Sequence, residues 1–147
     1  EISACLVGSE MCIRDSYTSC FVGRYESKVK DQFYPYIRPQ ETGNKTDVRW
    51  LMLLDGKGTG LQVTGLQPIA FSALHSSVED LDPGLTKKML RSIDVFPRRE
   101  VYLNVDLRQR GLGGDNTWGQ FPYRQYRMLG GKYTYSFVMK LVDANER

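Results

Sequence analysis

The sequence predicts an all-β protein, an antiparallel β-sandwich, and three observations support this class. Several short stretches alternate apolar and polar residues with period two, as strands with one buried face do. Turns rich in glycine separate these stretches. Only one stretch suits a helix, and it is short. Many short strands joined by glycine turns are typical of two packed antiparallel sheets.

The first predicted strands form a hairpin. Residues 48–54 are a dense apolar run that ends at the turn signal Asp-Gly-Lys-Gly of residues 55–58. Residues 60–65 alternate with period two, which predicts the second strand of the hairpin. Residues 68–74 follow as a further short strand.

One short helix and two more strands complete the pattern. Asp82 is placed to cap a helix over residues 83–90, although Gly84 lowers the helical propensity. The next predicted strand, residues 101–107, carries its apolar face on Val101, Leu103, Val105 and Leu107. The last predicted strand, residues 132–141, has one row of large side chains: Tyr133, Tyr135, Phe137, Met139 and Leu141.

Residues 1–16 resemble the translation of a sequencing adapter of the transposon-insertion type. The fixed codons of such an adapter read Leu-Val-Gly-Ser-Glu-Met-Cys-Ile-Arg-Asp, which is the sequence of residues 6–15. Ser3 and Ala4 fall in its variable sample index. We therefore expect residues 1–16 to be an adapter-derived, disordered segment, and residues 17–147 to be the domain.

Composition excludes several classes of protein. The formal net charge is +3, and the basic residues are spread along the chain instead of forming the stripe expected of a nucleic-acid binder. No apolar run approaches membrane-spanning length. Outside residues 1–16 only Cys20 remains, so no internal disulfide and no oxidising compartment are indicated. We expect neither nucleic acid nor membrane as a partner.

Residues 34–44 are the first candidate for chemistry. Two prolines impose an extended path, and Gly43-Asn44 supplies a turn. As a ligand loop, this stretch offers Arg38 and Glu41 as polar contacts. As an extended connection, its charged groups pair locally, and the residues alone favour this second interpretation.

Residues 110–120 are the second candidate, a glycine-rich loop that contains Trp118. They lack the GK[ST] of a phosphate-binding loop and the alternating acidic residues of an EF-hand. Trp118 is either a plug over the rim of the core or an exposed platform. On such a platform the apolar face of a sugar ring stacks while its hydroxyls stay hydrogen-bonded. Spacing alone favours the plug.

The acidic residues are the third candidate. Glycoside hydrolysis needs two carboxylates at a set separation, one of them often with a raised pKa. No apolar setting brings two acids together in the sequence, so a solvated surface is the better interpretation. His75, the single histidine, is expected on the surface or at a strand end. The acids considered are Glu79, Asp80, Asp82, Asp94 and Asp106.

Five motifs in a fixed order point to a known family. They are YxxPQExGN at residues 36–44, RW at 49–50, LNVD at 103–106, GLGGDNTW at 111–118 and YTYSF at 133–137. Each motif is weak alone. As an ordered set they resemble the C-terminal domain, or small chain, of large β-galactosidases of glycoside hydrolase family 2, the lactase type.

The resemblance covers essentially all of residues 17–147. It implies an antiparallel β-sandwich of the galactose-mutarotase-like supersandwich type, of which this chain holds an incomplete C-terminal half. It also implies a parent enzyme that hydrolyses terminal non-reducing β-D-galactose residues of lactose and other β-galactosides by a retaining mechanism. The family's catalytic glutamates and magnesium ligands lie on a central (β/α)8 barrel, outside this chain. No catalytic residue, metal ligand or cofactor is therefore assigned here, and a divalent cation, magnesium or calcium, is implied for the parent only.

The resemblance changes the interpretation of Trp118. In the family, the tryptophan of a GGDxxW loop reaches the active site from this domain, and Trp118 occupies that position. Trp118 is therefore expected to bind substrate by stacking on the sugar in the leaving-group or acceptor position. The residues expected to shape its loop are Gly113, Gly114, Asp115 and Asn116. The implied partners are a β-galactoside, the remaining domains of the parent and, in a homo-oligomer, further copies of it.

Two other function classes stay open beside the enzyme. A non-catalytic carbohydrate-binding β-sandwich would fold alone and bind sugar through Trp118. A structural interaction domain would show neither turnover nor sugar binding. As part of an enzyme, the chain alone is expected to be inactive, and the sequence does not distinguish a cytoplasmic from a periplasmic parent.

Overall fold

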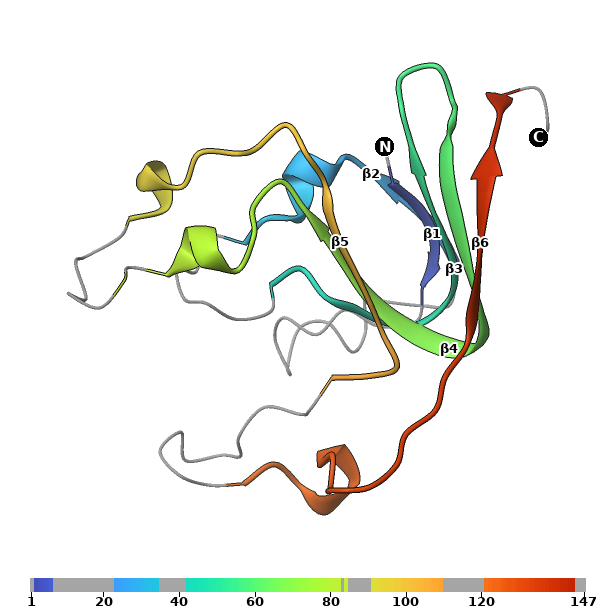
Figure 1. Cartoon of the computed structure of the whole chain (residues 1–147), viewed down its shortest axis with the longest axis vertical. Coiled ribbons are helices and arrows are strands. Elements are labelled where there is room, and N and C mark those ends of the chain that lie inside the picture. Colours follow the sequence, from blue (N-terminus) through green and yellow to red (C-terminus); the bar gives the residue numbers. More distant parts are fainter. Residues whose placement is uncertain are drawn as a thin grey trace.

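In the computed structural model, the described part of the chain comprises residues 2–6, 23–34, 42–82, 84, 91–109 and 121–144. It contains six strands and four short 3-10 helices, which Figure 1 shows. In chain order they are β1 (Ile2–Leu6), β2 (Gly23–Ser27), η1 (Val29–Gln32), β3 (Lys45–Leu54), β4 (Gly60–Leu74), η2 (Glu79–Leu81), η3 (Ser92–Asp94), β5 (Tyr102–Asp106), η4 (Arg124–Tyr126) and β6 (Phe137–Val142).

All six strands belong to one antiparallel sheet. Its order is β2-β1-β3-β4-β5, and β6 also pairs with β4. Residues 60–65 of β4 pair with β6, whereas residues 70–74 pair with β5. Figure 1 shows β4 curving sharply between these two halves, with β6 beside one and β5 beside the other. The predicted all-β, antiparallel class is confirmed, and the described strands form one bent sheet.

The predicted hairpin is present, and Asp55 organises its turn. The carboxylate oxygen Oδ1 of Asp55 accepts hydrogen bonds from the backbone N–H groups of Lys57, at 2.8 Å, and Thr59, at 2.9 Å. These bonds favour the charged carboxylate and hold the pKa of Asp55 below its usual value. Gly58 follows with φ of 87°, a conformation that favours glycine.

The bend in β4 interrupts the pairing with β3. Val48 pairs with Ile69, whereas Trp50 pairs with Thr64, so β4 has extra residues at this point. Extra residues in one strand bend it and increase its twist. The two strands predicted at residues 60–65 and 68–74 are therefore one strand with an internal bend.

Gly65 is required at this bend. A Cβ atom at this position would lie 2.3 Å from the carbonyl oxygen of Gln67 and 3.0 Å from Cγ2 of Ile69. The first distance is far inside van der Waals contact, so a side chain at this position would push the backbone apart.

The core gathers side chains from β3, β4 and η1. Leu103 and Val105 of β5 pack against it, as the predicted alternation of that strand requires. Burying one such side chain stabilises the fold by about 1.5–3 kcal/mol. The buried cluster consists of Val29, Val48, Leu51, Val63, Ile69, Phe71 and Ala73.

The last strand, β6, begins later than predicted. The backbone N–H of Leu66 and the side-chain amide of Gln67 both donate to the carbonyl oxygen of Ser136, at 3.0 and 3.2 Å. Ser136 thus contacts the bend of β4, where β4 turns away. Residues 132–135 precede this contact and have no strand partner in the described part of the sheet.

The disorder expected for residues 1–16 does not hold for Ile2–Leu6, which form β1 between β2 and β3. Ala4, for example, pairs with Tyr25 of β2 and Leu51 of β3. The backbone groups of an open strand edge need partners, and an extended segment with β-compatible residues supplies them. The adapter origin of residues 1–16 stays a prediction.

The helix predicted over residues 83–90 is described only at Gly84. The carboxylate of Asp82 accepts the Gly84 N–H at 2.9 Å, and Gly84 has φ of 77°. A right-handed helix requires negative φ. At this point the chain makes a local turn instead of the first turn of a helix.

Candidate functional site

The loop expected to carry the sugar-stacking residue lies outside the described residues. Trp118 falls within residues 110–120, so its position as platform or plug stays a prediction. The same holds for the expected loop-shaping residues Gly113, Gly114, Asp115 and Asn116. The structure does describe both ends of this loop, at Gln109 and at Phe121.

The first end leaves β5 through a short polar turn. The side-chain amide of Gln109 donates to Oδ2 of Asp106, the last residue of β5, at 3.0 Å. The guanidinium of Arg108 lies 5.5 Å from the ring centre of Tyr133, within cation–π range. The first end therefore contacts the chain segment that follows the loop.

The second end is held by Pro122 and Arg127. Pro122 is fully buried, and its carbonyl oxygen accepts a hydrogen bond from Nε of Arg127 at 2.6 Å. The Arg127 guanidinium also lies 5.2 Å from the ring centre of Phe121. One arginine thus fixes both residues at the end of the loop.

Tyr135 connects the two loop ends, which we call the base of the loop, to β5 and β6. The hydroxyl of Tyr135 donates to the carbonyl oxygen of Val105 in β5 at 2.9 Å. The Tyr135 ring lies 5.9 Å from the ring of Phe137 at the start of β6. The base of the loop is therefore tied to the same strands that build the core.

Aromatic rings and guanidinium groups together suit sugar binding, because a pyranose offers both an apolar face and hydroxyl groups. Phe121 is 67% exposed and Tyr123 is 59% exposed. The sequence reasoning did not single out these two side chains. The sequence signal for them is the pair of aromatic residues in the Phe-Pro-Tyr triplet directly after the glycine-rich loop.

The first candidate stretch, residues 34–44, is described at its ends only. Arg38 and Glu41 lie outside the described residues, so the choice between ligand loop and extended connection stays open. The predicted turn is present at Gly43, with φ of 65°. A Cβ at Gly43 would lie 2.5 Å from the carbonyl oxygen of Gln32, so the chain passes close to η1 at this point.

Lys45 follows this turn and is partly buried. Its ammonium donates to the carbonyl oxygen of Gly43 at 2.5 Å and lies 5.9 Å from the ring centre of Phe71. Burial removes water from the charged form and lowers the pKa of Lys45 to about 8. Lys45 therefore loses its proton closer to neutral pH than a fully hydrated lysine does.

Asp80, one of the candidate acids, forms an ion pair instead of a catalytic pair. Nε of Arg98 donates to Oδ2 of Asp80 at 2.8 Å, and a second guanidinium nitrogen donates to Oδ1 at 2.5 Å. The backbone N–H of Ser77 donates to the same carboxylate at 2.8 Å. The Arg98 guanidinium and this N–H hold the pKa of Asp80 below its usual value, whereas a general acid needs a raised pKa.

The other acids also serve local structure. Glu79 has a pKa below its usual value because it accepts hydrogen bonds from its own backbone N–H and from the hydroxyl of Ser77. Asp94 accepts the backbone N–H of Arg91 at 2.8 Å. Glu79 and Asp94 therefore have local hydrogen-bond partners, and the interpretation of these carboxylates as non-catalytic stays a prediction.

His75 lies at the end of β4, as predicted, and is half-buried. Its Nδ1 lies 3.1 Å from the carbonyl oxygen of Glu100. A carbonyl only accepts, so Nδ1 is the protonated nitrogen. His75 borders an open cleft of about 590 Å³, whose other lining residues are Lys28, Val29, Lys30, Leu54, Asp55, Gly56 and Val101.

The described residues provide neither a metal cluster nor a membrane-spanning helix. In this part of the chain, no group of three or more His, Cys, Asp or Glu side chains is arranged to hold a metal ion. No helix there has the length and apolar character needed to cross a membrane.

The chain matches one protein family and several curated proteins. The family model described as "Beta galactosidase small chain" matches residues 8–139, a range that begins within residues 1–16 and includes the whole glycine-rich loop. Among curated proteins, the β-galactosidase of Priestia megaterium is 33% identical over 127 residues, and that of Streptococcus thermophilus is 32% identical over 135 residues. The β-galactosidase of Lactobacillus delbrueckii subsp. bulgaricus is 36% identical over 112 residues.

The matched proteins are much longer than the chain. The matches cover 86%, 90% and 72% of this chain but only 12%, 13% and 10% of the three relatives, in the order given. The chain therefore corresponds to a small part of each relative.

Proposed function

The chain belongs to the β-galactosidase small-chain family, and on that premise we propose that it is part of a β-galactosidase. That enzyme would remove terminal non-reducing β-D-galactose from lactose and other β-galactosides. The observation that carries this proposal is the family match over residues 8–139, together with relatives that are all named β-galactosidases.

In the proposed enzyme, the bond-breaking step takes place outside this chain. Retaining hydrolysis uses one carboxylate as nucleophile and a second as acid and then base. The lowered pKa values of Asp80 and Glu79 do not suit the acid role, and the hydrogen bonds that both carboxylates accept within the chain occupy the oxygen atoms that a nucleophile would use. The catalytic glutamates and the divalent cation, magnesium or calcium, would belong to other domains of the parent. These domains are the first proposed partners of the chain, and a homo-oligomeric assembly is the second.

The role proposed for this chain is to present Trp118 to the sugar in the leaving-group or acceptor position. The loop that carries Trp118 begins and ends at a base of packed aromatic and guanidinium groups. A base held by Pro122, Arg127 and Tyr135 limits the motion of the loop ends. A rigid support lowers the entropic cost of sugar binding.

The proposal is tested with a hybrid enzyme. In it, the matching segment of the Priestia megaterium β-galactosidase is replaced by this chain, and turnover of a chromogenic galactoside is measured. We expect the hybrid to be active and the chain alone to be inactive. An inactive hybrid that is folded would contradict the proposed function, and turnover by the chain alone would contradict the placement of the catalytic carboxylates.

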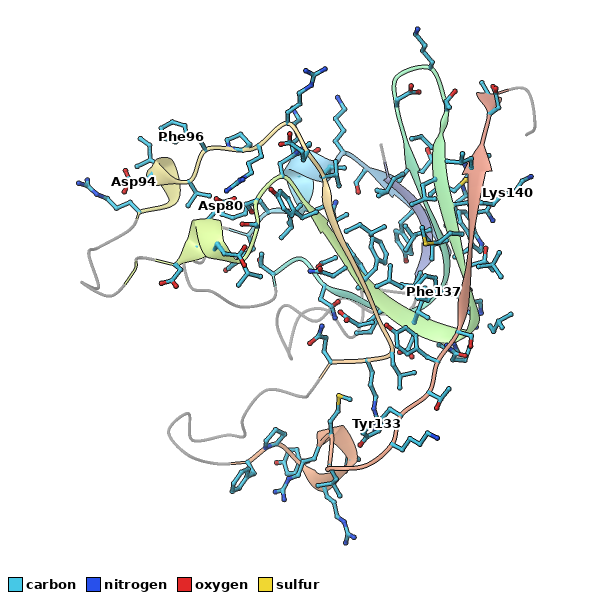
Figure 2. The ribbon with its side chains drawn as sticks, in the orientation of Figure 1. Asp80, Asp94, Phe96, Tyr133, Phe137 and Lys140 are labelled. Atoms are coloured by element: carbon cyan, nitrogen blue, oxygen red, sulfur yellow. The ribbon has the colours of Figure 1, made fainter. Side chains whose placement is uncertain are left out.

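Trp118→Ala in the hybrid tests the stacking role. We expect KM for a galactoside with a sugar leaving group to rise roughly tenfold, the equivalent of about 1.4 kcal/mol, with thermal stability unchanged. Phe96→Ala is the matched control, because Phe96 is also an aromatic residue and is 79% exposed beside η3 (Figure 2). An unchanged KM with a lower melting temperature would instead identify Trp118 as a plug over the core.

A further inference from the structure

Among the strands whose side chains the structure describes, β6 has the least covered apolar side chains. Phe137, Val138, Met139 and Leu141 are 36%, 55%, 59% and 81% exposed, in that order. β4 is the only partner of β6 among the described strands. Open apolar strands of this kind are typical of interaction surfaces.

The pairing with β4 shows which face of β6 belongs to the core. Met139 pairs with Val63, and Leu141 pairs with Leu61. Residues that pair directly in an antiparallel sheet have side chains on the same face. Val63 is fully buried and Leu61 packs against the core, so Met139 and Leu141 extend the core face of the sheet.

The core face of β6 therefore carries a continuous apolar row, Phe137, Met139 and Leu141, which we call the β6 row. Val138 and Lys140 lie on the opposite face, and Figure 2 shows Phe137 and Lys140 on opposite sides of the strand. The row contains no charged residue, and it continues the buried row of β4 without a break. Its members are nevertheless among the exposed residues of the chain.

We propose that the β6 row docks an apolar β-sheet face from the part of the β-galactosidase polypeptide that lies outside these 147 residues. This inference rests on the proposed function. The length of the relatives supports it, since the chain corresponds to 12% and 13% of two of them and most of such a protein is available as the partner. The chemistry of the row requires a partner face of aliphatic and aromatic side chains, because a polar face would lose water without gaining hydrogen bonds.

A second copy of the chain that pairs its β6 edge with this one would leave the row uncovered. Two β6 edges can pair and satisfy their backbone groups, but the sheet then becomes wider and the row stays uncovered. A layer packed face to face, about 10 Å away, covers the row itself. Continuity with the core thus favours a sheet layer over a strand added at the edge.

The test compares Val138→Cys with Met139→Cys, two adjacent positions of nearly equal exposure on opposite faces of β6. Each variant is prepared as the isolated chain and in the hybrid with the Priestia megaterium enzyme. The rate of alkylation by iodoacetamide is then read by peptide mass spectrometry. Both positions are exposed in the isolated chain, so both substitutions should leave its fold intact.

We expect position 139 to be alkylated roughly tenfold more slowly in the hybrid than in the isolated chain, while position 138 reacts at a similar rate in both. Equal rates at position 139 in the two proteins would overturn the proposal. Equal protection at both positions would also overturn it, because the effect would not be specific to the face. Protection at position 139 that grows with the concentration of the isolated chain would identify a second copy as the occupant.

Oxidation of Met139 in the unsubstituted protein is an independent test of the docking row. Peroxide oxidises an exposed methionine sulfur faster than a buried one, so Met139 should be oxidised more slowly in the hybrid than in the isolated chain. Galactosidase activity of the same hybrid reports on the proposed function separately. An active hybrid with rapid oxidation of Met139 would refute the docking row and leave the function standing. A folded, inactive hybrid with protected Met139 would refute the proposed function and leave the docking row standing.

Discussion

Residues 69–74 of β4 and the strand β6 have similar sequences and opposite environments. Both are nearly continuous apolar runs, IAFSAL and FVMKLV. All six residues of the first run are buried, whereas five of the six in β6 are exposed. A continuous apolar run is typical of a strand that is covered on both faces. An apolar run of this kind is stable when other parts of the protein cover both of its faces. The described part of the chain covers residues 69–74 in this way but not β6.

The largest expected effect comes from removing a side chain of the covered run. Phe71 is fully buried within the core cluster. Phe71→Ala should lower the free energy of unfolding by about 3–5 kcal/mol, because it removes buried apolar surface and leaves a cavity. Urea denaturation measures this change. A loss below about 1 kcal/mol would mean that this half of the sheet is not packed as described.

The bend that separates the two halves of β4 can be broken at Gly65. Gly65→Ala should cost about 1–3 kcal/mol, because the new Cβ would overlap the carbonyl oxygen of Gln67 and crowd Ile69. Gly56→Ala is the matched control, since no atom lies within 4 Å of a Cβ placed there. Denaturation of both variants side by side gives the comparison, and equal costs would argue against the close approach at Gly65.

Lys45, which pairs with Phe71 of the buried run, should make the free energy of unfolding depend on pH. The pKa of Lys45 is lowered to about 8 in the folded chain, below the ordinary value of about 10.5. Between these two values the unfolded chain binds more protons than the folded one, so this group makes stability rise as pH increases from 8 to 10.5. Below pH 8 both states are protonated and the contribution is constant.

Lys45→Met isolates this contribution. From pH 7.5 to pH 10, the free energy of unfolding of the unsubstituted chain should rise relative to that of Lys45→Met, by on the order of 1–2 kcal/mol. Paired urea denaturation curves at the two pH values measure the difference. Parallel pH profiles for the two proteins would show that Lys45 is not desolvated.

The smallest effect is expected in the open strand. Leu141 is 81% exposed, so Leu141→Ser in the isolated chain should change the free energy of unfolding by less than about 0.5 kcal/mol. Leu51→Ser, at a fully buried leucine, is the opposite case and should cost several-fold more. If Leu141→Ser were as damaging as Leu51→Ser, the β6 row would already be covered in the isolated chain.

Local patterns predicted the fold where neighbours in sequence decide it. The β3–β4 hairpin follows from an apolar run, the Asp55 turn and an alternating run. The predicted face of β5 is confirmed at Leu103 and Val105, which pack against the core, whereas Val101 is 40% exposed. At Gly84, the one described residue of the helix expected over residues 83–90, the φ of 77° does not suit a right-handed helix.

For the candidate site, the sequence motifs indicated the family and Trp118, whereas the structure revealed the contacts at the base of the loop. The ordered set of five motifs predicted the family, which the comparisons confirm, and within that set the GGDNTW motif pointed to Trp118. It carried no signal for the base of the loop, where Arg108 and Tyr133 come together from positions far apart in the chain. Contacts over such a separation depend on how β5 and β6 are placed by β4.

By itself, the sequence determined the all-β class, the antiparallel hairpin and the family, because alternation, turn residues and motifs are properties of short segments. Tertiary structure alone decided that residues 60–74 are one bent strand, that Ile2–Leu6 pairs with β3, and that the β6 row is uncovered. Each of these depends on which distant backbone edge or apolar face is open to a segment. That choice is made by the free energy of the assembled sheet.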